Sequence, residues 1–426
     1  MKDKLLIWAE KFQSNIYIKT LSSAMTGLMP LMMISSIVSL VGNINFLGIQ
    51  EMLVSSGIKN LLNQVNNMTL NVISLYVAFL IGYRLAELMG KEDKLNAGII
   101  GLMSFLILTP ISAPVLETGS TFSGIAMSAF GSQGMFSAMI AGVIGARLYI
   151  LFVDKKLVIK LPDSVPSIVS KGFSAIIPGF LVATIFGILY LIMLKTPFGD
   201  FSNMVLYLVQ TPLNALGNNI LAGLILVAFA ELLWFFGIHG SMAIMAIVMV
   251  LYYQPHLANL EAFNAGTPLP YLLTYGFIFG NRGARSFAVS LWCIFQAKSE
   301  QLKAVGKIGF IPALFGISEP IKFGIPQVMN VRMLIPLMLT PVVSLFSAYL
   351  LAIVGFLPYS NGVSLPLGSP IIVSAFFTNG WQGIVAQIIQ LILCYLVYIP
   401  FMSAQDKSCL SEEAVTEQSE LENVAA

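Results

Sequence analysis

The sequence predicts an all-α polytopic membrane protein with about ten transmembrane helices, two re-entrant hairpins and amphipathic interfacial helices. Of the 426 residues, 57% are hydrophobic and only 10% are charged. A soluble protein of this length cannot bury so much apolar surface in ordinary domains. The apolar residues also gather into runs of about 20, the length with which an α-helix crosses a bilayer. These two observations exclude the soluble classes of protein.

The composition also excludes several kinds of site. A formal net charge of +2 gives no basis for nucleic-acid binding. The three cysteines have no CxxC spacing and indicate neither a disulfide framework nor a metal site. The sequence contains no Walker A motif, no GxGxxG after a strand and no acidic metal cluster. We therefore expect no cofactor, no metal and no ATP-driven pumping within this chain.

The chain begins with a segment that does not resemble a signal peptide. Residues 1–19 carry four lysines but lack a long apolar core and a small-residue cleavage site. This pattern predicts an amphipathic segment that lies at the lipid interface.

Ten apolar segments follow, and each is a candidate membrane span. Some of these segments are shorter than about 20 residues. A shorter segment can still span the membrane when its flanking polar side chains extend to the interface. In chain order the segments are 20–42, 70–90, 96–111, 133–153, 173–194, 219–236, 241–254, 271–296, 333–356 and 384–402.

The lysines and arginines predict one orientation for these spans. They cluster before the first span, after the second, between the fourth and fifth, and after the eighth, whereas loops 43–69, 112–132 and 357–383 carry almost none. Because basic loops stay in the cytoplasm, both termini are predicted to be cytoplasmic. The acidic, polar tail 404–426 is predicted to be disordered.

Two segments contain too many helix breakers for an ordinary span. Residues 306–330 contain repeated glycines and prolines around Glu319, and we interpret them as a re-entrant hairpin with Glu319 near its tip. Broken backbone at membrane depth occurs only where it lines a cavity or is buried in protein. The uncharged, turn-rich segment 357–370 has the same character. The segment 254–270 is more polar and is interpreted as a linker or interfacial loop.

His239 and Glu319 are the leading candidates for a binding site. His239 lies in WFFGIHG and Glu319 in GISEPIKFGIP, both within strongly apolar sequence. A titratable group at mid-membrane costs ~2.5–3.5 kcal/mol or more, so its usual role is in a pathway or site. A histidine hydrogen-bonded within a helix turn and a carboxylate paired with Lys322 are the structural alternatives. His256, in the polar segment, is interpreted as structural.

Three further residues have an open interpretation. Trp381, in TNGWQG, has an indole that can stack on a sugar ring, but tryptophan is also a common interfacial anchor. Trp234 is interpreted as a core residue. Arg282 and Arg285, in GNRGARS, lie inside an apolar segment, where they can extend to the interface, pair with a glutamate or bind an anion.

These motifs together resemble a known family. LLWFFGIHG (232–240), AKSEQLKAVGK (297–307), GISEPIKFGIP (316–326) and the P–NG–P pattern of 358–370 are similar to signatures of a permease family. The family is the membrane subunit, IIC, of phosphoenolpyruvate-dependent sugar phosphotransferase systems, in its lactose/cellobiose/diacetylchitobiose group.

The resemblance implies a homodimer in the bacterial cytoplasmic membrane that takes up a β-linked disaccharide. It implies a scaffold and dimerisation part, roughly 20–200, and a substrate part, roughly 219–403, within a transport domain 20–403. The sugar would be held by His239 and Glu319, with Trp381 at a ring-stacking position and with Arg282 and Lys322 nearby. A separate IIB subunit, phosphorylated on a cysteine, would then transfer its phosphoryl group to the sugar.

The chain departs from the family pattern near the expected site. Residues 280–285 read GNRGAR where the family has a small, uncharged segment, Lys322 replaces an aliphatic residue, and residues 366–370 lack a tryptophan. The added cations require an internal partner or an anionic sugar. We favour an internal pair with Glu319, because Lys322 is one helical turn away from it. An ion-coupled secondary sugar transporter and a transport-inactive, sugar-sensing paralogue are the alternative functions.

Overall fold

The computed structural model describes residues 14–43, 49–111, 123–162, 165–281, 285–325, 327–366 and 368–425, and within these ranges the protein is helical and has no β-strand. The chain divides into two compact units. The first comprises Met1–Leu216 and Ala246–Pro268, and the second comprises Gly217–Met245 and Leu269–Ala426. The division based on sequence placed residues 246–268 in the second part, whereas they pack with the first unit.

The first unit contains the helices that precede residue 217 and most of α14. Their bounds are α2 Ile16–Gly27, α3 Met29–Gly42, α4 Ile49–Ser55, α5 Ile58–Thr69, α6 Ile73–Leu88, α7 Lys94–Leu108, η1 Met127–Ala129, η2 Ser132–Gly134, α8 Met135–Asp154, α9 Ser167–Ser174, α10 Ile176–Met193, α11 Phe201–Val205, η3 Leu206–Gln210, α12 Thr211–Gly217 and α14 Gly240–Ala265.

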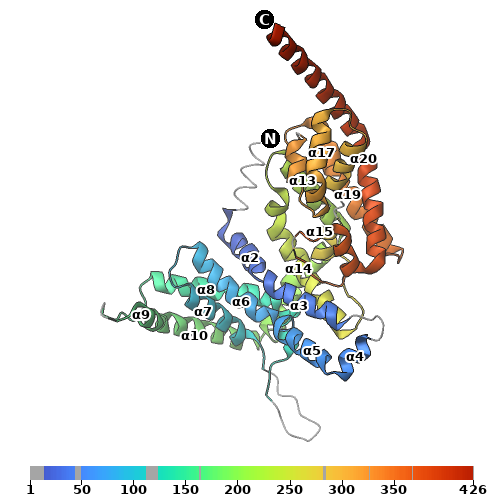
Figure 1. Ribbon diagram of the computed structural model, residues 1–426. Coiled ribbons are helices and arrows are strands. Elements are labelled where there is room, and N and C mark those ends of the chain that lie inside the picture. The colour runs from blue at the N-terminus through green and yellow to red at the C-terminus, as the bar shows by residue number, and fades with distance from the viewer. Residues whose placement is uncertain are drawn as a thin grey trace. The chain divides into compact units, whose positions relative to one another are not determined.

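Helices α6, α7 and α8 form the centre of the first unit, and α10 packs against α7 and α8 (Figure 1). Small residues let these helices approach closely, as membrane helices commonly do. A Cβ on Gly82 of α6, for example, would lie 2.4 Å from the Ala97 carbonyl oxygen of α7. The packing of this unit therefore depends on backbone contact as well as on apolar side chains.

Helix α14 corrects the prediction of a polar linker at 254–270. It continues through residue 265, and Gln254, His256 and Asn259 on it are almost completely buried. The Glu261 carboxylate accepts hydrogen bonds of 2.7 Å from both the backbone N–H and the hydroxyl of Ser132. These polar residues face protein rather than water, so the polar composition did not mark a loop. His256 is a buried helical residue rather than a loop residue.

The second unit contains the remaining helices. Their bounds are α13 Ile220–Phe235, α15 Tyr275–Gly280, α16 Arg285–Phe295, α17 Glu300–Leu314, α18 Glu319–Gly324, α19 Val331–Ile353 and α20 Ile371–Ala425. One apolar core joins α13, α16, α18, α19 and α20 and includes Trp234, Trp292, Ile321, Leu337 and Tyr398.

The segment predicted to form a re-entrant hairpin, 306–330, contains the second half of helix α17, a turn and the short helix α18, and its re-entrant character stays a prediction. The backbone stays helical from Glu300 to Leu314, although Gly306, Gly309 and Pro312 lie within it. A Cβ on Gly309 would lie 2.2 Å from the end of the Ile321 side chain of α18, so the glycine lets this side chain pack against α17. The break therefore falls after residue 314, and Glu319 begins the short helix α18. The predicted span 271–296 also consists of two short helices, α15 and α16, instead of one long helix. Gln387 of α20 donates a hydrogen bond of 2.7 Å to the carbonyl oxygen of Gly280, the last residue of α15.

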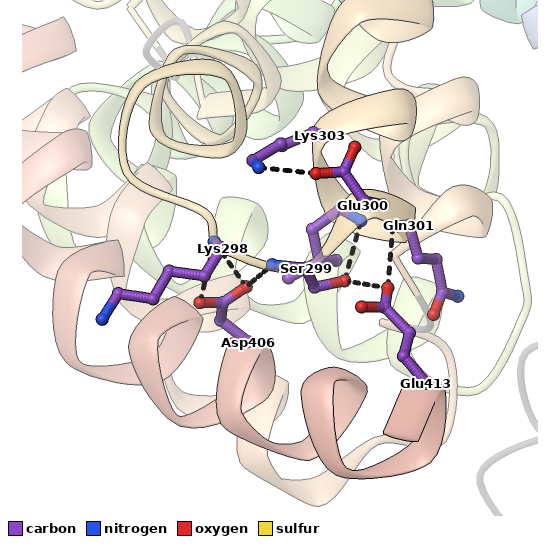
Figure 2. A network of polar contacts seen from close by, with 8 residues as sticks. Lys298, Ser299, Glu300, Gln301, Lys303, Asp406 and Glu413 are labelled. Atoms are coloured by element: carbon purple, nitrogen blue, oxygen red, sulfur yellow. Dashed lines mark hydrogen bonds and ion pairs between the residues drawn. The ribbon is translucent and has the colours of Figure 1, made fainter. Parts of the chain in front are cut away.

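Helix α20 corrects the prediction of a disordered tail, at least through residue 415, because it continues past the membrane segment and contacts the start of α17 (Figure 2). Asp406 accepts from the backbone N–H groups of Lys298 and Ser299 at about 3 Å, and Glu413 accepts from the Ser299 hydroxyl at 2.6 Å. Glu413 also accepts from the Gln301 N–H at 2.9 Å. The two carboxylates thus satisfy N–H groups that a helix N-terminus leaves without intrahelical partners.

Seven helices of the described chain are long and apolar enough to cross a membrane, or eight if the bent pair Phe201–Gly217 and Ile220–Phe235 is one span. Helix α7 is apolar but shorter. The count of ten crossings stays a prediction, because the other crossings would have to be made by shorter helices.

Candidate functional site

His239 lies in the turn that joins α13 to α14. Two glycines shape this turn. Gly237 has a φ of +82°, a conformation that L side chains rarely adopt, and a Cβ on Gly240 would lie 1.7 Å from the Ala230 carbonyl oxygen. Gly240 thus lets the backbone of α13, at Ala230, approach the start of α14 closely. The turn holds the histidine between the end of one helix and the start of the next.

Glu319 lies in a second turn, between α17 and α18, that includes Gly316 with a φ of +77°. It is the first residue of α18 and is followed by Pro320, a residue that suits the first turn of a helix. The Met329 N–H, which follows α18, donates to the Phe235 carbonyl oxygen at the end of α13 at 2.9 Å. This bond ties together the two segments that carry His239 and Glu319.

The structure brings His239 and Glu319, the two leading candidates from the sequence, close together. The His239 Nε2 atom is 3.5 Å from Glu319 Oε1, and both side chains remain more than two-fifths exposed. The Nδ1 atom of His239 accepts a hydrogen bond from the Met242 N–H at 3.3 Å. In the neutral imidazole the proton is therefore on Nε2. An N–H donor and a carboxylate acceptor are thus presented side by side.

Trp234 packs behind this pair. Its ring centroid lies 4.6 Å from that of His239 and 6.2 Å from that of Phe323, and the side chain is almost fully buried. The Lys322 ammonium lies 4.1 Å from the indole centroid, within cation–π range. The interpretation of Trp234 as a core residue is confirmed, and its contacts also support His239.

The cations near the site share a buried carboxylate. Glu231 of α13 is 1% exposed and lies 2.6 Å from Arg285 Nη1 and 2.8 Å from Lys322 Nζ. Both cationic side chains are largely buried as well, with 15% and 7% exposed. The internal pairing favoured from the sequence is present, but its carboxylate is Glu231. The predicted pairing of Lys322 with Glu319 is wrong.

The other predicted site residues lie apart from the pair or outside the structure. Arg282 lies outside the described residues. Trp381 follows the kink of α20 at Gly380, where φ is +71°, and its side chain is 59% exposed. Its ring meets that of Phe356 edge to face at 5.8 Å. None of the contacts in the described chain joins Trp381 to His239 or Glu319.

The sequence of this chain matches a known protein family. A model of the family described as "Phosphotransferase system, EIIC" matches residues 22–341, about three-quarters of the chain. The chain belongs to this family. The EIIC assignment agrees with the resemblance carried by the GIHG and GISEP motifs, and it makes the chain a multi-pass bacterial membrane protein and a transport subunit.

Individual relatives match along nearly their whole length. The lichenan permease IIC component of Bacillus subtilis (strain 168) is 35% identical over 97% of this chain and 94% of its own. The cellobiose-specific EIIC component of Geobacillus stearothermophilus is 32% identical over 97% of this chain and 95% of its own. The crystal structure of ChbC, the IIC component of the N,N'-diacetylchitobiose-specific system, superposes with a TM-score of 0.90 at 30% identity and covers 97% of this chain and 99% of that chain.

One buried residue of this EIIC site was not identified from sequence. Glu231 stands near the end of an apolar helix, and a carboxylate in that position is itself a signal of function or pairing. Its only signal in the sequence is one charge in an apolar helix, whereas the helix breakers that mark His239 lie in the turn that follows. In the described part of the chain no cluster of three or more His, Cys, Asp or Glu side chains is placed to hold a metal ion.

Proposed function

We propose that this EIIC protein binds a neutral, β-linked disaccharide through His239 and Glu319 and carries it across the bacterial cytoplasmic membrane to a phosphorylated IIB subunit. The observation that supports this most directly is the His239–Glu319 contact. The two groups are 3.5 Å apart, come from two motif turns and keep more than two-fifths of each side chain exposed.

The pair is chemically complementary to a sugar hydroxyl. A hydroxyl group both donates and accepts, so it can donate to the Glu319 carboxylate while it accepts from the His239 Nε2–H. Hydrogen bonds to an ionised partner are the stronger kind and contribute about 1.5–3 kcal/mol. Phosphoryl transfer to that hydroxyl also requires removal of its proton. Glu319 is the acceptor that we assign to this step.

The named relatives support the sugar class. Cellobiose and N,N'-diacetylchitobiose, which appear in the names of two relatives, are β-linked disaccharides without net charge. Trp381 offers a second contact, because its exposed indole can stack on the apolar face of a pyranose ring. Its ring is held on one side by Phe356 and is otherwise accessible.

A separate IIB subunit as the phosphoryl donor also has support from the relatives. The lichenan and cellobiose proteins that this chain matches almost completely are named as IIC components alone. In contrast, the lactose-specific EIICB component of Lacticaseibacillus casei is matched over 72% of its length. The remaining part of the EIICB protein of Lacticaseibacillus casei is not matched by this chain, and we therefore propose that the phosphoryl group comes from a separate IIB protein.

The proposed topology places both termini in the cytoplasm and the protein in a homodimer. Two ion pairs of the first unit join two of the segments predicted to face the cytoplasm, the loop after the second span and the loop between the fourth and fifth spans. Lys91 lies 2.7 Å from Asp154, and Lys171 lies 3.2 Å from Glu92. Their shared location supports a shared side of the membrane.

A vesicle experiment tests this function. Proteoliposomes that contain the protein are given radiolabelled cellobiose, with or without a cysteine-phosphorylated IIB protein of a cellobiose system inside the vesicle. We expect cellobiose phosphate to accumulate only with the phosphorylated IIB, and collapse of the proton and sodium gradients to leave this accumulation intact. Uptake of unmodified sugar that follows an ion gradient would instead support a secondary transporter, and binding of cellobiose without any uptake would support the transport-inactive, sugar-sensing paralogue.

A further inference from the structure

We infer that Glu231 determines the charge specificity of the sugar site by sequestering Arg285 and Lys322 from the ligand. This inference rests on the proposed function, because it concerns the sugar that His239 and Glu319 would hold. The three residues come from three helices, α13, α16 and α18, and meet at one buried carboxylate.

The geometry gives each cation a partner other than the ligand. Arg285 Nη1 lies 2.6 Å from one oxygen of Glu231, and Lys322 Nζ lies 2.8 Å from the other. Both oxygens of the carboxylate are therefore engaged. Because Nη1 of Arg285 is bound to Glu231 and only 15% of the side chain is exposed, the planar fork is less available to a carboxylate or phosphate on a ligand.

The triad is nevertheless close enough to act on the site electrostatically. Lys322 lies 4.1 Å from the Trp234 ring centroid, and the same ring lies 4.6 Å from that of His239. Lys322 and Glu319 also share the short helix α18. The charge on Lys322 therefore acts through one buried aromatic ring, where screening by water and salt is weak.

Among the described residues of this region, the formal charges of the triad and Glu319 balance when the ligand is neutral. Two cations and the Glu231 carboxylate leave one positive charge, which the Glu319 carboxylate offsets while His239 is neutral. A neutral sugar keeps this balance, whereas an anionic sugar adds an uncompensated charge. Removal of Glu231 would free two buried cations for an anionic group, so Glu231 is a specificity-determining residue without ligand contact.

The test compares cellobiose with cellobiouronic acid, a matched disaccharide that carries one carboxylate. Their dissociation constants are measured by calorimetry on the folded, purified protein. Wild type should prefer cellobiose. In Glu231→Gln the ratio of the two constants should shift toward the acid by on the order of tenfold or more, because the unit charge that is removed is buried and is screened less than an exposed charge.

Two more variants keep the test decisive. Lys322→Met leaves the one-to-one Arg285–Glu231 pair and should shift the ratio away from the acid. The double variant Glu231→Gln with Lys322→Met restores the wild-type charge of the triad and should restore the wild-type ratio. If Glu231→Gln does not fold, Lys322→Met alone carries the test.

The outcomes separate this inference from the proposed function. An unchanged ratio in Lys322→Met, or in a folded Glu231→Gln, would overturn the role of the triad in specificity. If Glu319→Gln still weakens cellobiose binding in the same assay, the sugar site stands even then. If Glu319→Gln has no effect, the proposed site itself fails.

Discussion

The Lys322 ammonium lies 2.8 Å from the carboxylate of Glu231, a residue 91 positions earlier in the chain. Lys322 is also one turn from Glu319 on α18, yet its carboxylate partner is on α13. Glu231 holds Arg285 at the same time, so one buried anion compensates two buried cations. The triad therefore has one anion and two cations. Loss of the single anion should change the stability of the protein more than loss of one cation.

Glu231→Gln should destabilise the protein more than Lys322→Met does. The glutamine variant leaves two buried cations without a counter-charge, and breaking a buried pair by removing one partner costs about 3–5 kcal/mol. The methionine variant keeps the Arg285–Glu231 pair intact. Thermal unfolding in detergent should show a clearly larger fall in Tm for Glu231→Gln. Lys303→Met, which removes a surface ion pair with Glu300, serves as the control. An equal fall in Tm for all three variants would contradict the role of Glu231 as the shared counter-charge.

The C-terminal part of α20 should contribute to the stability of the second unit. Asp406→Asn replaces a buried carboxylate that accepts from two backbone N–H groups at the approach to α17, and bonds to a charged acceptor contribute about 1.5–3 kcal/mol. We expect a lower Tm and faster proteolysis near residues 296–303. Glu300→Gln, on the same helix turn but largely exposed, should change neither. A chain truncated after residue 403 that melts like wild type would show that the helix only rests on the surface.

Trp381→Ala should weaken binding of cellobiose, and Trp381→Phe should weaken it less. The indole is exposed and braced edge to face by Phe356, which leaves an aromatic surface for a sugar ring. Loss of one aromatic contact costs about 0.5–1.5 kcal/mol, so a several-fold rise in Kd is expected for alanine. Equilibrium dialysis with labelled cellobiose measures this, with Phe376→Ala as an exposed aromatic control on the same helix. Equal affinity in all of these proteins would assign Trp381 to the lipid interface.

Sequence reasoning identified the residues whose signal is local. The GIHG turn and the GISEP turn contain helix breakers beside a titratable group, and that pattern selected His239 and Glu319. The structure places the two side chains 3.5 Å apart, and their role in sugar binding stays a prediction. Spacing along one helix then suggested Lys322 as a partner of Glu319. That step failed because the buried partner comes from a distant helix, and local spacing carries no information about such contacts.

Composition misled the interpretation of two polar segments. The acidic tail was predicted to be solvated, but Asp406 and Glu413 stand at positions i and i+7, on one face of a helix, and that face meets the start of α17. Polar residues of α14 were predicted to form a loop, but Glu261 accepts a hydrogen bond from Ser132, and the polar residues Gln254, His256 and Asn259 of the same helix are buried. In both cases the polar groups satisfy backbone and hydroxyl donors of the protein instead of water.

The measurement that tests the central claim most directly is the affinity for cellobiose of wild type, His239→Ala and Glu319→Gln, each shown to be folded. If the two side chains share a sugar hydroxyl, each variant should bind about ten- to a hundredfold more weakly, since each loses a hydrogen bond within a charge-assisted pair. Glu92→Gln, at an exposed carboxylate of the first unit, should bind like wild type. Unchanged affinity in both His239→Ala and Glu319→Gln would contradict the proposed sugar site.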